Sequence, residues 1–304
     1  MREVVVSSPA KINLSLGVGA VRGDGFHPLA TVYQAIGLYD EVAARPGTDG
    51  DFSLTVEGDE RLSVSEVPTD DSNLAMQAAK LLAARRGVQA AVHLTIHKGI
   101  PVAGGLAGGS ADAAAALVAC DALWGTKTSR QELMTIAAEL GSDVPFSLVG
   151  GTAIGTGRGE VVAPAMAKGS YWWVVLESEK GLSTPAVYRE FDRMHADQPP
   201  PAPGVPDQLM AALRTGDIER LGAALSNDLQ PAALRLRPEL EQSLGYGIEG
   251  SAHGAIVSGS GPSCLFLTEG QPHAVQVAGW LKGYGLGPVS FAPGPVAGAR
   301  VVSR

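Results

Sequence analysis

A chain of 304 residues, of which 45% are hydrophobic, can form one large or two ordinary domains around a substantial core. The net charge of −8 argues against nucleic acid as a partner, and no apolar run reaches the roughly 20 residues that cross a bilayer, so we expect no membrane partner. With two cysteines and no secretory signal at the N-terminus, we expect a cytoplasmic protein, and the sequence makes no prediction of its oligomeric state.

The chain opens with two predicted strands. Alternating apolar residues indicate strands over Val4–Ser7 and Ile12–Val18, joined by a short linker that contains Lys11. A turn-rich segment with Phe26 and His27 follows, before an apolar stretch that runs to residue 38. Considered alone, this lysine is typical of a solvated strand end, and this histidine of a loop.

A helix and two strands are predicted next. Phe52–Val56 and Ala91–Lys98 have the composition of strands, and Ser72–Arg86 has helical spacing with its first residue as the cap. The pair His93 and His97 suggests a metal site, but four residues of strand separate them by about 13 Å at ~3.3 Å per residue. We therefore interpret both as histidines on the solvated face of the strand.

A glycine-rich loop, Gly104–Gly109, joins that strand to a helix predicted over Ser110–Trp124. Glycine lets the backbone approach a ligand closely, and a helix N-terminus directs free N–H groups and a positive dipole at one spot, so the segment predicts a phosphate site. The Walker A pattern fails because Ser110 stands where lysine is required, and the dinucleotide pattern fails at Leu106. The alternative interpretation of the glycine-rich loop is a flexible linker. Lys98, next to this loop, either contacts phosphate or lies on the surface.

A second helix, Arg130–Leu140, ends at a glycine and is followed by Asp143, which considered alone is typical of a turn. Residues 150–159 read as a glycine-rich strand and turn. The chain changes character around Ala163–Ser170, where we place a boundary between domains of residues 1–165 and 166–304.

The second half has an order of strands and helices that suits a ferredoxin-like split sheet. Its predicted elements are a strand at Tyr171–Leu176, helices at Gln208–Arg214, Ile218–Leu229 and Pro238–Tyr246, two strands with a glycine turn at Ala255–Leu267, a helix at Ala274–Tyr284 and a strand at Arg300–Ser303.

Four segments in this order resemble the GHMP kinases, the family of galactokinase, homoserine kinase and mevalonate kinase. They are Pro9–Leu14, the pattern P-x-x-x-G-L-x-G-G-S-[SA]-D from Pro101 to Asp112, Gly141–Phe146 and Ser258–Ser263. The resemblance implies an α+β fold of two domains: a ribosomal-protein-S5-like, ATP-binding N-terminal domain and a ferredoxin-like C-terminal domain. It also implies a small-molecule kinase that uses ATP and Mg²⁺, and a third glycine loop, in Ser258–Ser263, packed beside the phosphate loop; a simple hairpin is the alternative there.

The resemblance further implies a cofactor site on the glycine loop, in which Ser110 also contacts the metal. Its implied members are Pro101, Gly104, Gly105, Leu106, Ala107, Gly108, Gly109, Ser110 and Ala111. In Ala111 the chain lacks the second serine that many members carry. Asn73 is implied to lie near the adenine, and a helix cap is the alternative for it.

Within the family, Asn13 and the Phe26-His27 pair are similar to members that phosphorylate the 2-hydroxyl of a cytidine diphosphate-linked methylerythritol in non-mevalonate isoprenoid synthesis. That likeness implies Lys11 and Asp143 as catalytic residues, the aspartate as general base. The implied substrate-binding residues are Asn13, Phe26, His27, Thr184 and Tyr188, with the cytosine between Phe26 and Tyr188. The alternatives are a kinase of homoserine or mevalonate type and a catalytically silent nucleotide-binding module.

Overall fold

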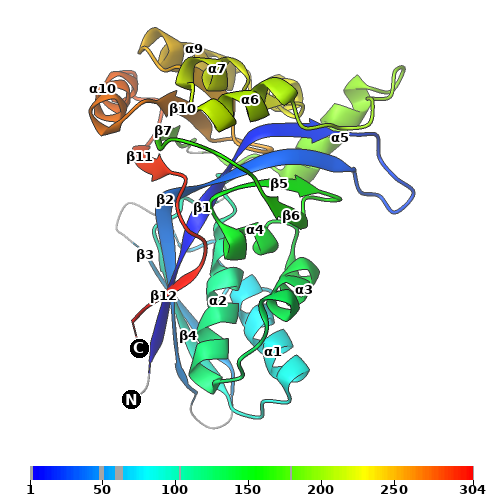
Figure 1. The fold of residues 1–304 in the computed structure, drawn as a ribbon, viewed down its shortest axis with the longest axis vertical. Coiled ribbons are helices and arrows are strands. Elements are labelled where there is room, and N and C mark those ends of the chain that lie inside the picture. Colours follow the sequence, from blue (N-terminus) through cyan, green and yellow to red (C-terminus); the bar gives the residue numbers. More distant parts are fainter. Residues whose placement is uncertain (1–2, 48–50, 59–63, 103, 179, 304) are drawn as a thin grey trace.

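Two sheets, joined through the long strands β1 and β2, form the framework of the chain (Figure 1). The computed structural model describes residues 3–47, 51–58, 64–102, 104–178 and 180–303. In this part of the chain the first sheet has the order β12-β1-β2-β4-β3, with β5 and β6 branching from β2 and β8 pairing with β1. Its strands are β1 (Val4–Val18), β2 (Leu29–Pro46), β3 (Ser53–Gly58), β4 (Val92–Lys98), β5 (Thr152–Thr156), β6 (Val161–Pro164), β8 (Ser226–Asn227) and β12 (Arg300–Ser303).

The first two predicted strands form one strand, β1, so the predicted linker around Lys11 is wrong. The pairing of β1 with β2 shifts register between Pro9 and Ala10 and again between Asn13 and Ser15. Such irregularities let a strand accept proline, which donates no ladder hydrogen bond, and they redirect the neighbouring side chains. The segment that carries Lys11 and Asn13 therefore lies between two register shifts in the pairing of β1 with β2.

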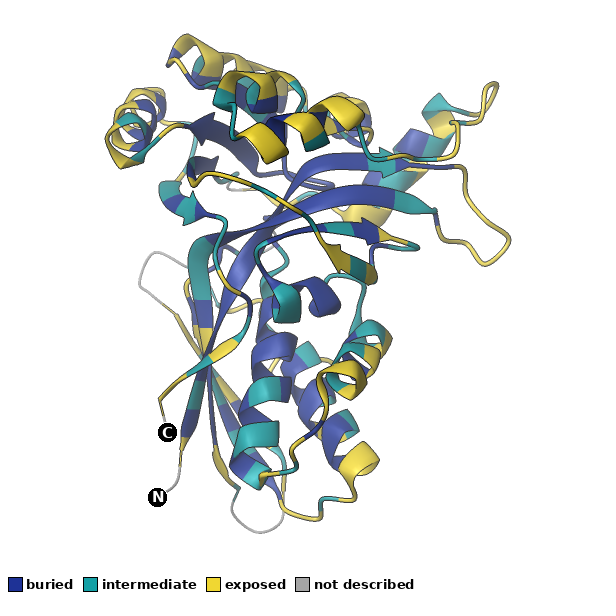
Figure 2. Cartoon of the chain, viewed as in Figure 1, coloured by how far each residue is buried: buried dark blue, intermediate teal, exposed yellow. Residues whose placement is uncertain are grey.

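Four helices cover one face of the first sheet (Figure 1): α1 (Leu74–Arg86), α2 (Gly108–Trp124), α3 (Arg130–Leu140) and α4 (Val144–Val149). The alanine-rich α2 is buried without interruption from Ala111 to Leu117, which small side chains permit because they let the sheet and α1 approach closely. The cap predicted at Ser72 is wrong by one position, since Asn73 caps α1. The helix α2 begins at Gly108, two residues before the predicted start at Ser110. Figure 2 shows buried residues running along β1, β2 and the inward sides of these helices.

The second sheet has the antiparallel order β11-β7-β10-β9, the ferredoxin-like arrangement that the resemblance implied. Its strands are β7 (Tyr171–Leu176), β9 (Gly254–Val257), β10 (Cys264–Thr268) and β11 (Val289–Gly294). Strand β11 was not predicted, because its alternation is weak and it ends in Pro-Gly. The predicted strand Arg300–Ser303 does not close this sheet: as β12 it pairs with β1 of the first sheet.

The remaining helices are α5 (Thr184–Met194), α6 (Asp207–Thr215), α7 (Ile218–Ala223), α8 (Gln230–Leu236), α9 (Glu239–Glu249) and α10 (Gln271–Lys282). The single helix predicted over Ile218–Leu229 is wrong, because the chain leaves α7 and pairs with β1 at Ser226–Asn227. The Asn227 amide donates to the carbonyl groups of Val257 and Gly259, at 2.9 and 2.7 Å, and holds this segment extended.

A shared core joins the two sheets. Ile12 and Val32 of the first sheet pack in one buried cluster with Trp173 and Leu265 of the second. The Trp173 indole N–H donates to the side-chain oxygen of Gln34 on β2 at 2.8 Å. The polar group of this fully buried ring therefore has a hydrogen-bond partner. Among the described residues, no helix has the length and apolar character needed to cross a membrane.

Two glycines of α9 provide a matched test of this packing. A Cβ added at Gly247 would overlap the buried ring of Phe266, whereas one added at the exposed Gly245 would meet nothing within 4 Å. We expect Gly247→Ala to lower the free energy of unfolding by about 1–3 kcal/mol through overpacking. Gly245→Ala should raise it by about 0.5–1 kcal/mol, because alanine is the better helix former. Urea unfolding of the two variants measures both, and equal effects would contradict the close approach of α9 to β10.

Candidate active site

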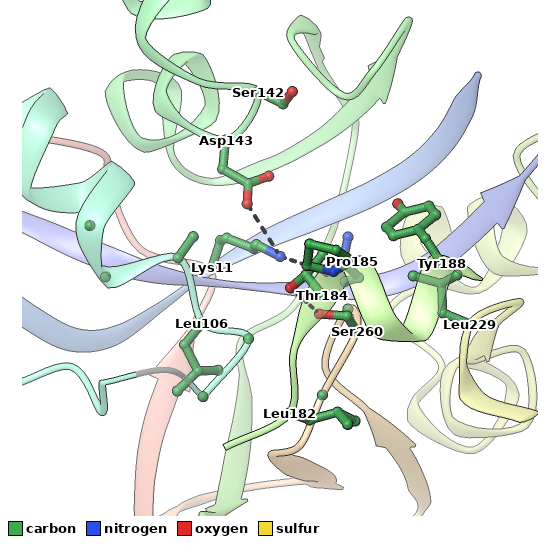
Figure 3. Close-up of a pocket in the computed structure, with 18 of the residues that line it drawn as sticks. Lys11, Leu106, Ser142, Asp143, Leu182, Thr184, Pro185, Tyr188, Leu229 and Ser260 are labelled. Atoms are coloured by element: carbon green, nitrogen blue, oxygen red, sulfur yellow. Dashed lines mark hydrogen bonds and ion pairs between the residues drawn. The ribbon is translucent and has the colours of Figure 1, made fainter. Parts of the chain in front are cut away.

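A cleft of about 1000 Å³ lies where β1, the glycine loop before α2, the start of α4, the start of α5 and the β9–β10 turn meet. The structure gathers nearly all predicted site residues around it: Lys11, Asn13, Phe26, His27, Asn73, Pro101, Gly104, Gly105, Leu106, Ala107, Gly108, Gly109, Asp143, Thr184 and Tyr188. Ser110 and Ala111 are the two predicted residues that do not line it. Figure 3 shows Lys11 and Asp143 pointing toward each other in this cleft.

Lys11 is held by a directed chain of hydrogen bonds. Its ammonium donates to Asn13 Oδ1 at 2.9 Å, and Asn13 Nδ2 donates to Thr31 Oγ1 at 2.8 Å. The Thr31 hydroxyl itself donates to the Ser15 carbonyl at 2.6 Å, so it can only accept from Asn13. The amide of Asn13 therefore has one orientation, with its oxygen toward the lysine.

Asp143 precedes α4, and its side chain makes no cap hydrogen bond to that helix. Its Oδ1 accepts from the Tyr33 hydroxyl at 3.1 Å, and its Oδ2 lies 3.7 Å from Lys11 Nζ. Burial and the charge of Asp143 raise the pKa of Tyr33 well above its ordinary value, so the phenol stays protonated and remains a donor. The carboxylate is 30% exposed, which leaves it accessible from the cleft.

The glycine loop has the geometry of an anion site. Gly105 and Ala107 have left-handed φ angles of 74° and 59°. Within the described residues, the N–H groups of Gly108, Gly109 and Ser110 have no hydrogen-bond partner, and they sit at the positive end of a 17-residue helix. These groups can bind phosphate oxygens. Ala103, which belongs to the matched pattern from Pro101 to Asp112, lies outside the described residues.

Ala111 does not line the cleft, and its contact with the cofactor stays a prediction. Its side chain is fully buried, and its N–H donates to the Ala107 carbonyl at 2.9 Å. The missing serine hydroxyl at this position would point into the core. Ser110 is half-buried in the first turn of α2.

The third glycine loop packs directly on the phosphate loop, which confirms the predicted proximity. Ser258 Oγ donates to the Gly105 carbonyl at 3.1 Å, and a Cβ on Gly105 would overlap the Ser258 carbonyl oxygen. A Cβ on Gly259 would stand 3.5 Å from Lys11 Nζ. Glycine at position 105 lets the two backbones come so close, and Gly259 has a left-handed φ of 56°, which favours glycine. The loop also connects β9 and β10 as a hairpin, so the two interpretations are compatible.

Aromatic rings form the other end of the cleft. Tyr188 lies against His27 with ring centroids 4.9 Å apart and an interplanar angle of 34°. His27 Nδ1 lies 2.8 Å from the Gly19 carbonyl, which can only accept, so this nitrogen carries the hydrogen. Phe26 is 50% exposed and packs against the Arg158 guanidinium at 4.8 Å. Burial and the nearby Asp143 raise the pKa of Tyr188 to about 12, which keeps its hydroxyl neutral.

Two further predicted residues have clear structural partners. Asn73 caps α1 through a 2.8 Å bond from the Ala75 N–H, and its amide also donates to the Pro68 carbonyl at 2.7 Å. The cap interpretation is therefore confirmed, and contact with adenine stays a prediction. Thr184, at the start of α5, lies 2.7 Å from Ser260, which ties this helix to the third glycine loop (Figure 3).

Sequence reasoning missed a buried charged cluster under the phosphate loop. Lys98 pairs with Asp40 and, at 2.8 Å, with Asp112, and Asp40 also accepts the N–H groups of Gly99 and Ile100 at 2.7 and 2.8 Å. Burial acts to lower the pKa of the Lys98 ammonium, but the charges of the two carboxylates outweigh burial, so the pKa of Lys98 is raised. Burial and the charge of Asp40 raise the pKa of the Asp112 carboxyl. The surface interpretation of Lys98 is wrong, because the residue is buried, and its contact with phosphate stays a prediction.

The signal for this cluster was present in the strand. Lys98 continues the buried face of β4 after Val92, Leu94 and Ile96, and a lysine on a buried face requires a partner. A Cβ on Gly108 would stand 3.1 Å from its ammonium, so the cluster lies directly beneath the start of α2.

Replacing Lys98 by methionine should lower the free energy of unfolding by about 3–5 kcal/mol, because two buried carboxylates would lose their cation. The matched control is Lys80→Met, since Lys80 pairs with Asp71 at 2.5 Å on the surface. That change should cost less than ~1 kcal/mol. Urea denaturation at neutral pH compares the two, and a loss for Lys98→Met no larger than for the control would disprove the role of the buried pair.

Two family models and several curated proteins match this chain. Residues 73–151 match the family model "GHMP kinases N terminal domain", and residues 209–282 match "GHMP kinases C terminal". The chain is 55% identical to a 4-diphosphocytidyl-2-C-methyl-D-erythritol kinase of Nocardioides sp., covering 97% of this chain and 99% of the relative. It is 54% identical to the protein of the same name from Thermobifida fusca, covering 98% of each.

Solved structures show the same relationship. A crystal structure of 4-(cytidine 5'-diphospho)-2C-methyl-D-erythritol kinase superposes with a TM-score of 0.77 at 31% identity, covering 97% of this chain and 100% of that one. A homoserine kinase from Cytophaga hutchinsonii, with a TM-score of 0.75 at 18% identity and coverage of 99% and 98%, shares the fold. With two family models matched in order and relatives similar over nearly their whole length, this chain belongs to the GHMP kinase family.

Proposed function

We propose that this chain transfers the γ-phosphoryl group of ATP to the 2-hydroxyl of 4-diphosphocytidyl-2-C-methyl-D-erythritol, a step of non-mevalonate isoprenoid synthesis. The observation that carries the proposal is one cleft lined by the phosphate loop, the Lys11–Asp143 pair and the His27–Tyr188 ring pair. Full-length relatives at 52–55% identity are named for this kinase. A kinase for homoserine or mevalonate would have no use for the ring pair, and a silent module would need neither Lys11 nor Asp143.

Phosphoryl transfer needs mainly positioning and charge stabilisation from the protein. The free N–H groups of Gly108 and Gly109 would bind the β- and γ-phosphates, with the α2 dipole adding positive potential. Asp143 would accept the proton of the attacking hydroxyl, with Tyr33 holding its Oδ1. Lys11 would stabilise the charge that develops on the transferred group, because Asn13 keeps its ammonium in place.

The phosphate oxygens would supply most of the ligands of a Mg²⁺ ion, and the bound ion would supply charge neutralisation. The Ser110 hydroxyl is the proposed protein ligand: it lies in the first turn of α2, beside the free N–H groups, and makes no hydrogen bond in the described part of the chain. Residues 1–165 are the proposed ATP-binding domain and residues 166–304 the second domain. Because β12 pairs with β1, that strand would be packed as part of the first domain.

The cytosine would bind at the aromatic end of the cleft. With Nδ1 of His27 donating to Gly19, the neutral ring presents Nε2 as an acceptor, which suits the exocyclic amino group of cytosine. Asp192 lies 3.5 Å from the same nitrogen and can accept the second amino hydrogen. Tyr188 and the half-exposed Phe26 offer ring faces, while Asn13 and Thr184 are the proposed contacts to the alcohol and diphosphate part.

The direct test of the reaction is ADP production from Mg-ATP by the purified chain, with the cytidine compound, homoserine or mevalonate as acceptor. We expect turnover with the cytidine compound alone. Turnover with another acceptor only would overturn the proposed substrate, and nucleotide binding without turnover on any of the three would favour the silent module.

Asp143→Asn should lower kcat at least ~100-fold, since the amide cannot accept the hydroxyl proton. The free energy of unfolding should change little, because the amide oxygen still accepts from Tyr33. Ser142→Ala is the matched control, a neighbouring cleft residue outside the proposed chemistry, and should keep kcat within about threefold. Steady-state kinetics measure both; a kcat for Asp143→Asn within that range would rule out the general base.

Tyr188→Ala should raise KM for the cytidine substrate about 10-fold through loss of a stacking face, with KM for ATP unchanged. Tyr188→Phe keeps the face and should behave as wild type. The two KM values, together with competition by cytidine diphosphate, check this prediction. An equal rise in KM for ATP would place Tyr188 outside the cytosine site.

A further inference from the structure

A second group of metal-ligating side chains lies at one end of the second sheet, away from the residues that line the cleft. His253, Glu269 and His273 each offer one ligand atom, and these atoms all lie within 4.8 Å of one another. None of the three lines the cleft.

Each of the three residues is held by regular structure. His253 directly precedes β9, and its N–H donates to the Leu267 carbonyl of β10 at 2.9 Å. Glu269 follows the last residue of β10, and His273 lies in the first turn of α10. The imidazoles are only 20% and 16% exposed, and the Glu269 side chain is 69% exposed. The group is therefore a shallow site with two fixed rings and one adjustable carboxylate.

The distances suit a shared ion better than direct hydrogen bonds. Glu269 Oε1 lies 3.7 Å from His253 Nε2 and 3.8 Å from His273 Nδ1, both too long for a hydrogen bond. Two ligands at about 2.1 Å from a tetrahedral ion lie about 3.4 Å apart. A shift of a few tenths of an ångström, within reach of the exposed glutamate, would bring its oxygen to that separation from both nitrogens.

The nitrogens also have the lone pairs that a metal requires. His273 Nε2 lies 3.1 Å from the Ser251 carbonyl, which can only accept, so this nitrogen carries the hydrogen and Nδ1 keeps its lone pair. That lone pair accepts the Glu269 N–H at a long 3.5 Å, a weak bond that a bound ion would replace. A ring hydrogen donated to a carbonyl is the usual support for a metal-bound histidine. His253 Nε2 is buried and has no hydrogen-bond partner within the described residues. A bound cation would satisfy it.

We propose that His253, Glu269 and His273 bind a divalent transition metal such as Zn²⁺, with the fourth position open to water. Two imidazoles and one carboxylate suit Zn²⁺, Co²⁺ or Cu²⁺ and not Mg²⁺, which prefers oxygen ligands. This site is distinct from the Mg²⁺ that would accompany ATP. The bound ion would link the start of β9, the end of β10 and the start of α10, and so stabilise one end of the second sheet.

The experiment uses the full chain without an affinity tag or nucleotide, in millimolar Mg²⁺. Calorimetric titration with Zn²⁺ should show one ion per chain with a Kd in the micromolar range or tighter. Co²⁺ should give the intense visible absorption of a tetrahedral site. Zn²⁺ should also raise Tm. Cys120 and Cys264 are buried, and burial raises the pKa of each thiol, to about 12 for Cys264, so thiols will not compete.

Variants assign the binding to these residues. His253→Gln and His273→Gln should each weaken Zn²⁺ binding at least ~10-fold and remove the Co²⁺ absorption. His97→Gln is the matched control, because His97 also lies beside a glutamate, Glu57 at 3.1 Å, and should leave both signals unchanged. The proposal is overturned if wild-type chain binds no Zn²⁺ below millimolar concentration, or if both variants bind it as wild type does. Circular dichroism of the variants excludes misfolding as the cause of a loss.

Discussion

The site depends on a short free stretch along one edge of β1. On that edge β12 pairs with residues 5–7 and β8 with residues 15–16, and between them the Lys11 N–H donates to the Leu106 carbonyl of the phosphate loop at 3.1 Å. The loop thus takes the place of a strand at the position of the proposed catalytic lysine. The third glycine loop packs on its other side through Gly105. Backbone contacts therefore set the distance between the phosphate site and Lys11, and these are stiffer than contacts between long side chains.

Buried polar groups then orient the Lys11 side chain and the phosphate loop, whose positions the backbone contacts set. The Lys11–Asn13–Thr31 chain and the Lys98 cluster both lie almost out of contact with solvent. Their net contribution to stability is small, because desolvation offsets much of the attraction between charges. A paired polar network does, however, disfavour alternative arrangements, since another packing would leave the buried ammonium of Lys98 or Lys11 without its partners. We interpret the two networks as the reason that the loop and the lysine have one geometry. The proposed metal site in the second sheet would add a similar restraint at a place where, among the described residues, His253 Nε2 has no hydrogen-bond partner.

The sequence was sufficient where a local pattern has one physical solution. The glycines before α2 predicted an anion site because few other arrangements leave so many N–H groups free, and the alternation of β4 predicted which of its faces is buried. It was insufficient where two local solutions are close in energy. Pro9 favoured a break between two strands, but pairing with β2 continued past it with a register shift. The apolar spacing of residues 218–229 favoured one helix, but the Asn227 amide bonds to two carbonyl groups that lie distant in sequence.

By itself the sequence determined the family, the two-domain α+β class and many of the residues around the cleft, because those depend on motifs whose chemistry is local. Only the tertiary structure decided that Tyr33 holds Asp143, that Lys98 is buried between two carboxylates, that Ala111 points into the core and that β12 returns to the first sheet. Each of these joins residues far apart along the chain. Such contacts depend on the close packing of sheets and helices against one another. The spacing of residues within one segment does not encode that packing.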